Sequence, residues 1–374
     1  MPGFEIIDKK EKKAILDLFS PGNQVLFAHG FEKMRKNFHV REFENQIAKF
    51  SKSKYCLAVS SGTAAIKISL LALGVKAGDE VITQAFNFIA TAEAIHDIGA
   101  KTVICDIDDT LNMCPNDLRK KISRKTKAII PVHMLGVSAK MSEIIKIAKK
   151  KQIPVCEDVC EAFGGKYKSK SLGMLGDIGV LSFDFGKTIT TGEGGAIITN
   201  NKKLFNYSMS YHDHGHENKF PSRGNDSAKF FGFNYRMTEM QAVVGKTQLS
   251  KINLILKKNE ERYKVLEKIL KAKFKIREIP KKSKQNFEAF IFSAENKSKN
   301  KIISLLSKQG FGTKNLPDAI KWHCSYYWKR GLNNKQIKNS YKSKIKLSSR
   351  IAIPIFLKKS INDYYNLANK ILKI

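Results

Sequence analysis

Short apolar runs alternate with helix-like segments from about residue 54 to residue 200. The runs YCLAVSS, EVIT, TVICDID, AIIPVH and PVCEDV predict buried strands, and stretches such as GTAAIKISLLALG and MSEIIKIAKKK predict helices between them. Near-continuous apolar strands separated by helices are typical of a mainly parallel sheet with helices on both faces. Two further strand-like runs, GVLSF and GAIIT, bring the predicted sheet to seven strands.

The connection between the last two of these strands differs from the earlier ones. It consists of the glycine- and threonine-rich loop SFDFGKTITTGEGG, where the earlier strands are followed by helix-like segments. Loops that are held by a rigid sheet often carry functional residues. The loop is therefore a candidate functional segment.

A different pattern begins at Thr238 and continues to the C-terminus. The sequence T-E-M-Q is a capping box, and it predicts the start of a long amphipathic helix that continues through Leu249 and Ile252 toward Leu270. The following residues mix the strand-like runs FEAFIFSA and IAIPIF with helical segments. We therefore predict an α/β protein with a large domain at residues 1–250, including an N-terminal arm, and a small α/β domain at residues 251–374.

The net charge of +33 raises the possibility of a nucleic acid or an anionic membrane as partner. The lysines are spread along the whole chain at solvent-type helix positions, and no helix-turn-helix, RNP or zinc-finger spacing accompanies them. A lysine bias of the whole genome would produce the same charge. We therefore predict no nucleic-acid partner and keep a basic nucleic-acid-binding protein as an alternative that rests on charge alone.

Hydropathy and cysteine content predict a cytoplasmic protein. The chain has no apolar run of about eighteen residues, which predicts no membrane span. Its charged N-terminus, MPGFEIIDKKEKK, lacks the apolar stretch of a signal peptide. The six cysteines contain no C-x-x-C pair and lie mostly in apolar runs, so we predict reduced thiols.

Three separate features of the large domain suggest a phosphate-bearing cofactor. In AVSSGTAA, Gly62 and Thr63 follow a strand and begin a helix, whose free N–H groups can bind phosphate. Asp158 ends an apolar strand, at the edge where open α/β sheets bind ligands, although an isolated Asp there is more often a helix cap. Lys187 lies in the loop described above, after Ser182, and a lysine held against apolar surface can lose its proton and react with a carbonyl.

Eight ordered sequence blocks resemble those of a known family. They are AVSSGTAA, GDEVI, FIAT, PVHMLG, EDVCEAFGG, GDIGVLSF, KTITTGEGG and GFNYRMTEMQ. With these blocks the chain resembles the sugar aminotransferases of the DegT/DnrJ/EryC1/StrS type, from about residue 42 to residue 252 and more weakly beyond. The resemblance implies pyridoxal 5'-phosphate (PLP) as cofactor and the PLP-dependent transferase fold type I, with a seven-stranded sheet between helices.

The resemblance also assigns roles to the residues that match the family's motifs. Lys187 would be the catalytic lysine that binds PLP covalently, and Asp158 would pair with the nitrogen of the PLP ring. Gly62, Thr63 and Ser182 would hold the phosphate.

Three further positions follow from the same resemblance. Phe88 would stack on the ring, although without the family it would be interpreted as a core residue. Glu161 stands near the ring hydroxyl, where many members have Gln or His. Asn234 would reach the phosphate of the neighbouring subunit's cofactor, which implies a homodimer with shared active sites.

Retention of the lysine implies transamination, because family members that deoxygenate sugars have histidine in its place. L-glutamate would donate the amino group and a keto-sugar would accept it. Lys187 would move the proton between carbon atoms in each half of the reaction. A non-catalytic, regulatory PLP-binding protein is a distant alternative, and no DNA-binding domain that would favour it is visible.

Three segments in the second half of the chain suggest which sugar is the acceptor. Three histidines alternate in YHDHGHEN, but no cysteine or carboxylate cluster with ligand spacing accompanies them, so we predict no metal site. Together with RGND and KWHCSYYW, this segment resembles the branch that aminates the eight-carbon sugar acid Kdo at C8. The excess of cations predicts positive side chains in the cleft. Candidate substrate contacts are His214, His216, Arg223, Trp322 and His323, for which surface or packing roles are an equal alternative. The alternative acceptor is a nucleotide-linked 3- or 4-keto-6-deoxyhexose.

Overall fold

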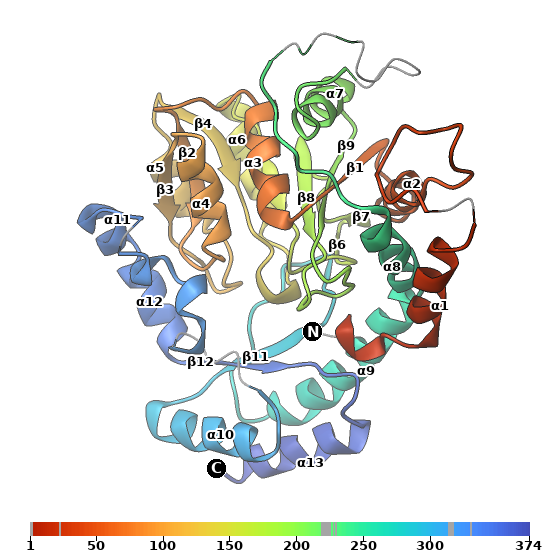
Figure 1. The fold of residues 1–374 in the computed structure, drawn as a ribbon. Coiled ribbons are helices and arrows are strands. Elements are labelled where there is room, and N and C mark those ends of the chain that lie inside the picture. The colour runs from red at the N-terminus through yellow and green to blue at the C-terminus, as the bar shows by residue number, and fades with distance from the viewer. Residues whose placement is uncertain are drawn as a thin grey trace.

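The computed structural model describes residues 3–21, 24–217, 226, 228, 230–312, 318–329 and 331–374. Its centre is a series of seven strands (Figure 1). Hydrogen-bonded order is β3-β2-β4 in one part and β5-β8-β9-β1 in the other, and isolated parallel bridges join β4 to β5. Only β9 runs antiparallel to its neighbours, which confirms the mainly parallel sheet. The strands are β1 (Tyr55–Val59), β2 (Glu80–Gln84), β3 (Lys101–Cys105), β4 (Thr126–Ile130), β5 (Cys156–Asp158), β8 (Ile178–Ser182) and β9 (Gly195–Thr199).

Helices bury both faces of this sheet. Successive side chains of a strand point to opposite faces. In β1, for example, Ala58 packs in one apolar core and Leu57 in the other. The first core lies under α2 (His39–Ser51), α5 (Pro115–Lys121), α6 (Met141–Lys150) and α8 (Glu239–Ser250), and the second under α3 (Gly62–Ala72), α4 (Ala90–Asp97) and α7 (Lys202–Tyr211).

The predicted long helix is two helices. The capping box is present, since the side chains of Thr238 and Gln241 each bond the other residue's backbone N–H. The helix α8 ends at Ser250, and α9 (Ile252–Leu270) starts after Lys251. The side chain of Lys251 turns inward and bonds the buried carboxylate of Glu11, in α1 (Lys9–Leu18). The helix expected from the sequence is therefore interrupted at Lys251.

A smaller layer follows α9. The strands β11 (Ala289–Ser293) and β12 (Arg350–Pro354) pair antiparallel. They share an apolar core with α9, α10 (Asn296–Lys308) and α13 (Ile361–Leu372). The short strands β6 (Lys166–Tyr167), β7 (Lys170–Ser171) and β10 (Ser283–Lys284) form a separate three-stranded sheet.

Part of the C-terminal chain returns to the large sheet before β12. Cys324 forms a bridge with Phe86, just beyond β2, and the side chain of Gln336 donates to the carbonyl of Thr102 in β3. One stretch of chain beyond residue 250 thus packs against the large sheet. The domain boundary proposed at residue 250 therefore stays a prediction. The elements concerned are η3 (Asp318–His323), η4 (Ser325–Tyr327), α11 (Asn334–Asn339) and α12 (Tyr341–Ser348).

Two further short helices are η1 (Phe4–Ile6) and η2 (Met134–Gly136). All six cysteines lie in the described chain as free thiols. Over the described ranges, no helix has the length and apolar character needed to cross a membrane.

Candidate active site

The start of α3 forms a close-fitting corner with the end of β8. Ser61 caps the helix, its hydroxyl accepting from the N–H of Ala64 at 3.0 Å. The N–H groups of Gly62 and Thr63 precede this bond and have no helical carbonyl to pair with. A Cβ on Gly62 would lie 2.9 Å from the Cβ of Ser182, so only glycine fits there. These groups together form a cradle suited to an anion.

Asp158 lies at the carboxyl end of β5 and is buried. Its carboxylate accepts from the hydroxyl of Thr91 at 3.2 Å and from the N–H of Cys160 at 3.0 Å. Burial raises the pKa of Asp158, while the bond from Cys160 and the charge of Lys187 act in the opposite direction. A carboxylate in this position gains most from a cationic partner, because a nearby positive charge offsets the cost of burying it.

Lys187 faces the same space from the loop between β8 and β9. Its side chain is 15% exposed, and Nζ lies 3.9 Å from Oε1 of Glu161. Burial lowers the pKa of the Lys187 amine, but Glu161, followed by Cys160 and Glu288, raises it, and the net shift is upward. The sequence predicted an apolar environment around this amine. The structure places acidic groups around it instead.

Glu161 joins Lys187 to His323. Nε2 of His323 lies 3.3 Å from Oε1 of Glu161, and the other carboxylate oxygen accepts from the N–H of Leu135 at 3.1 Å. The backbone carbonyl of His323 in turn accepts from the N–H of Asn87 at 2.8 Å. The returning C-terminal segment thus brings a histidine to the edge of the site.

Phe88 forms part of the wall beside this histidine. Its ring is 5.0 Å from that of His323, and it stacks on Trp322 at 6.3 Å with an angle of 22° between the planes. The side chain of Phe88 is 38% exposed, so Phe88 is not a core residue. An exposed ring at a cavity wall can stack on a flat ligand, which supports its expected role.

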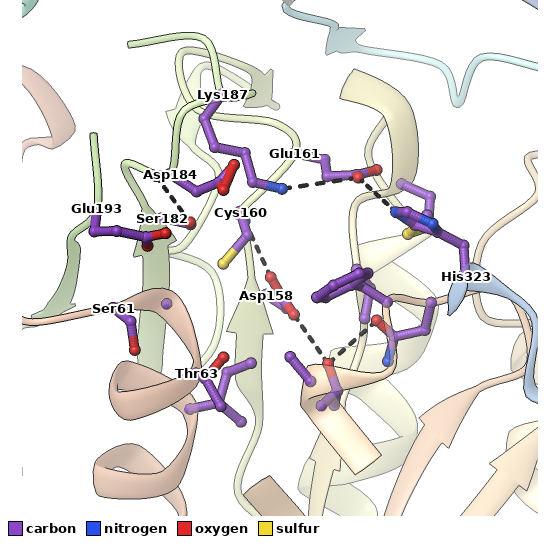
Figure 2. A pocket seen from close by; sticks show the side chains of 18 residues that line it. Ser61, Thr63, Asp158, Cys160, Glu161, Ser182, Asp184, Lys187, Glu193 and His323 are labelled. Carbon is purple, nitrogen blue, oxygen red and sulfur yellow. Dashed lines mark hydrogen bonds and ion pairs between the residues drawn. The ribbon is translucent and has the colours of Figure 1, made fainter. Parts of the chain in front are cut away.

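These groups line one cavity of about 410 Å³ (Figure 2). Its size suits a small-molecule cofactor. Sequence reasoning missed several polar residues of the wall, although Thr91 lies in the FIAT block and Glu193 in the TTGEGG block. The missed polar residues and thiol are Ser61, Asn87, Thr91, Cys160, Asp184 and Glu193.

The charge of the wall differs from the expected excess of cations. Among the lining residues in the described chain, Lys187 and His323 are the basic ones. They stand against four carboxylates, which belong to Asp158, Glu161, Asp184 and Glu193. The described lining residues therefore do not form a cleft rich in positive charge, and the expectation from the sequence is wrong on this point.

Four of the remaining candidates lie outside the lining of this cavity. Asn234 and His214 are exposed, and His216 pairs with Asp226 at 3.0 Å. Trp322 is 66% exposed and reaches the site through its stacking on Phe88. Arg223 lies outside the described residues.

The cavity fits PLP. The α3 cradle with Ser182 suits the phosphate, and the buried carboxylate of Asp158 suits a protonated ring nitrogen. The amine of Lys187 is available for the aldehyde, and Phe88 offers a face for the ring. When bound, PLP supplies an electron sink that stabilises negative charge on the substrate carbon. Together with the seven-stranded sheet, this site defines a PLP-dependent transferase of fold type I.

Comparisons with known proteins identify the family. Residues 27–362 match the DegT/DnrJ/EryC1/StrS aminotransferase family. The chain is 36% identical to GDP-perosamine synthase of Escherichia coli O157:H7 over 259 residues, 68% of each protein. It is 38% identical to UDP-2-acetamido-2-deoxy-3-oxo-D-glucuronate aminotransferase of Pseudomonas aeruginosa, covering 64% of this chain and 66% of that protein. The chain belongs to the DegT/DnrJ/EryC1/StrS family and is a PLP-dependent sugar aminotransferase.

Solved structures agree with this assignment. An aminotransferase from Psychrobacter cryohalolentis superposes with a TM-score of 0.85 at 25% identity, covering 98% of this chain and 97% of the other. The Helicobacter pylori aminotransferase PseC, involved in pseudaminic acid biosynthesis, superposes with a TM-score of 0.83 at 26% identity. The alignment with PseC covers 98% of this chain and 96% of that one. The fold predicted from the sequence is therefore confirmed.

Replacing Glu161 with glutamine should speed covalent attachment of PLP to Lys187 at pH 8. Glu161 raises the pKa of Lys187, so its removal lowers that pKa and increases the neutral, reactive fraction of the amine. We expect the rate, followed by absorbance after PLP is added to cofactor-free protein, to rise about tenfold. The difference should shrink as the pH rises above the pKa of wild-type Lys187, where both amines are neutral.

The matched control is Glu193→Gln, which removes another carboxylate of the cavity wall. Glu193 is not among the largest contributors to the pKa of Lys187, so the attachment rate should stay near the wild-type value. Equal rates for Glu161→Gln and wild type across the pH range would contradict the role given to Glu161.

Proposed function

We propose that the protein transfers an amino group from L-glutamate to a carbonyl carbon of a keto-sugar in the cytoplasm, with Lys187 and Asp158 as catalytic residues. One observation supports this most strongly: an anion cradle, a buried carboxylate and an amine face one cavity from three different elements. Asp158 would keep a proton on the ring nitrogen. Nζ of Lys187 would take a proton from the substrate carbon and deliver it to the neighbouring carbon of the cofactor, and it would move a proton in the reverse direction in the second half of the reaction.

We propose Kdo oxidised at C8 as the acceptor, with 8-amino-8-deoxy-Kdo for lipopolysaccharide as the product. His323, from the segment that resembles the Kdo branch, lines the cavity, and Trp322 packs on its wall. The reacting end of this sugar is a neutral polyol chain, which suits walls with hydroxyl and carboxylate groups. The carboxylate of the sugar, at the far end of the chain, would remain outside the acidic part of the cavity.

A nucleotide-linked 3- or 4-keto-6-deoxyhexose is the alternative acceptor. The names of the relatives favour it, since one is a GDP-perosamine synthase and another acts on a UDP-linked sugar acid. Here too the charged part of the substrate would lie away from Lys187.

A substrate comparison separates the two acceptors. Purified enzyme is incubated with glutamate and either the Kdo-derived aldehyde or a nucleotide-linked keto-hexose, and 2-oxoglutarate is measured. Lys187→Ala provides the background rate. We expect kcat/KM to be higher for the aldehyde, and His323→Ala to raise KM for the sugar more than for glutamate. If only the nucleotide sugar reacts, the Kdo proposal is wrong and the aminotransferase assignment stands.

We further propose a homodimer in which Asn234 acts in the partner's site. Asn234 is exposed and does not line its own cavity, and an antiparallel bridge to Asp213 holds its backbone. Two exposed aromatic side chains, Phe231 and Phe233, are its close neighbours in the chain, and exposed apolar side chains of this size favour an interface at this surface. The phosphate cradle of one chain would then be completed by an amide from the other.

Mixing two inactive variants should restore activity if the sites are shared. Lys187→Ala subunits lack the amine and Asn234→Ala subunits lack the donated amide, but a mixed dimer contains one site with both residues. We expect equal mixtures, after subunit exchange verified by mass, to recover about a quarter of wild-type activity, because half of the dimers are mixed and each has one complete site. Activity no higher than that of the separate variants would show that each chain builds its own site.

A further inference from the structure

The first described residues contact the loop that carries Lys187. The N–H of Gly3 donates to the backbone carbonyl of Lys187 itself, at 3.2 Å. The ring of Phe4 stacks on Phe185, two residues before the lysine, with centroids 4.5 Å apart and 19° between the planes. A Cβ on Gly3 would lie 2.8 Å from the same Lys187 carbonyl oxygen and 3.0 Å from the backbone of Ile189. The contact is therefore close on both sides of Lys187, from Phe185 to Ile189.

The other end of this N-terminal segment, residues 3–8, is tied to different parts of the molecule. The carboxylate of Glu5 accepts from the N–H of Leu357, which follows β12. The carbonyl of Ile6 accepts from Nζ of Lys251 at 2.8 Å, and the same ammonium lies 3.1 Å from Asp8. The segment thus lies between the large sheet and the β11–β12 layer (Figure 1).

Few hydrogen bonds hold the loop at the lysine itself, although the next residue, Thr188, is anchored from outside the loop by the side chain of Asn286, which donates to its hydroxyl at 3.1 Å. Within the loop, the N–H of Lys187 donates to the carbonyl of Asp184 at 3.1 Å, and the N–H of Gly186 donates to the Asp184 carboxylate. These are local turn bonds, which fix the shape of the turn and not its position over the cavity. The bond from Gly3 and the stacking of Phe4 come from outside the loop, and they act on the backbone from which the lysine side chain extends.

We propose that Gly3 and Phe4 are positioning residues for Lys187: they hold its backbone where Nζ reaches the cofactor. The inference rests on the proposed role of Lys187. A covalent bond between two fixed groups forms only if the backbone is placed to within a fraction of an ångström, so displacement of the loop reduces the probability of attachment. The segment therefore contributes to cofactor binding although it does not line the cavity.

Two variants disturb this contact in different ways. Phe4→Ala removes the stacked ring, and Gly3→Val places a Cβ against the Lys187 carbonyl, so that either the segment or the loop must move. Phe4→Tyr keeps the ring and should behave as wild type. Ile7→Ala, at an exposed position of the same segment, is the matched control.

Two measurements distinguish positioning from general stability. One is the dissociation constant of PLP for the full-length protein, and the other is the pH titration of the visible absorbance of the holoenzyme. We expect Phe4→Ala and Gly3→Val to weaken PLP binding about three- to tenfold, the range set by one aromatic contact, and to shift the titration. The thermal midpoint measured in parallel shows whether the fold is intact.

A double-mutant cycle identifies the route. Phe185→Ala should weaken PLP binding as much as Phe4→Ala, and the double variant should add little, because both remove the same contact. Wild-type PLP affinity and titration in both Phe4→Ala and Gly3→Val would overturn the inference. If wild-type protein itself does not attach PLP to Lys187, the proposed function fails instead, so the two failures are distinguishable.

Discussion

Lys187→Ala should abolish turnover. In the described part of the chain Lys187 is the lysine that lines the cavity, and both covalent attachment of the cofactor and proton transfer are assigned to its amine. Losing a group with two roles in each half-reaction should reduce kcat by about four orders of magnitude or more. PLP should still bind without a covalent bond, because the α3 cradle and Asp158 remain.

The measurement is 2-oxoglutarate formation from glutamate, with PLP content determined in parallel. Lys170→Ala removes an exposed lysine of β7 and should retain full activity. A Lys187→Ala enzyme that retained more than a trace of activity would show that another amine performs the proton transfer.

Asp158→Asn should reduce kcat by about two to three orders of magnitude, the usual loss when one preorganised charge at a reacting centre is removed. Asparagine keeps the size of the side chain: its oxygen can still accept from the N–H of Cys160, and its NH2 group, in place of the other carboxylate oxygen, can donate to the hydroxyl of Thr91. It cannot balance a positive charge on the ring nitrogen, so the ring becomes a weaker electron sink. Burial also raises the pKa of Asp158, so the carboxylate gains more from that partner than an exposed one would.

The thermal midpoint of Asp158→Asn should remain near or above that of the wild type, because a buried charge is removed while its hydrogen bonds stay possible. Glu193→Gln, which neutralises another carboxylate of the wall, is the matched control and should change kcat much less. A near-normal rate for Asp158→Asn would mean that this carboxylate only caps the turn at Cys160.

The strands and the main site residues were predictable because their signals are local. A buried parallel strand appears in the sequence as a short apolar run. A residue directly after such a strand lies at the carboxyl edge of the sheet, whatever position the strand has in the strand order. This placed Asp158 and the start of α3 correctly at the edge of the sheet. The loop with Lys187 was marked by the missing helix between β8 and β9.

Contacts between distant segments were not predictable in the same way. The neighbourhood of Glu161 and His323 depends on how the returning C-terminal segment pairs with Phe86, and nothing in either local sequence encodes that pairing. The break at Lys251 likewise depends on the buried Glu11 of another helix. The acidity around Lys187 is a property of residues that come together only in the fold, so the sequence predicted an apolar surrounding instead.

The most direct test of the account is to locate the bound cofactor on the chain. Holoenzyme is treated with borohydride, which reduces the bond between PLP and an amine to a stable linkage, and the digested protein is mapped by mass spectrometry. We predict a single modified peptide from the loop between β8 and β9, with the pyridoxyl group on Lys187. Modification of a different lysine, or no modification of holoenzyme that contains PLP, would contradict the central claim.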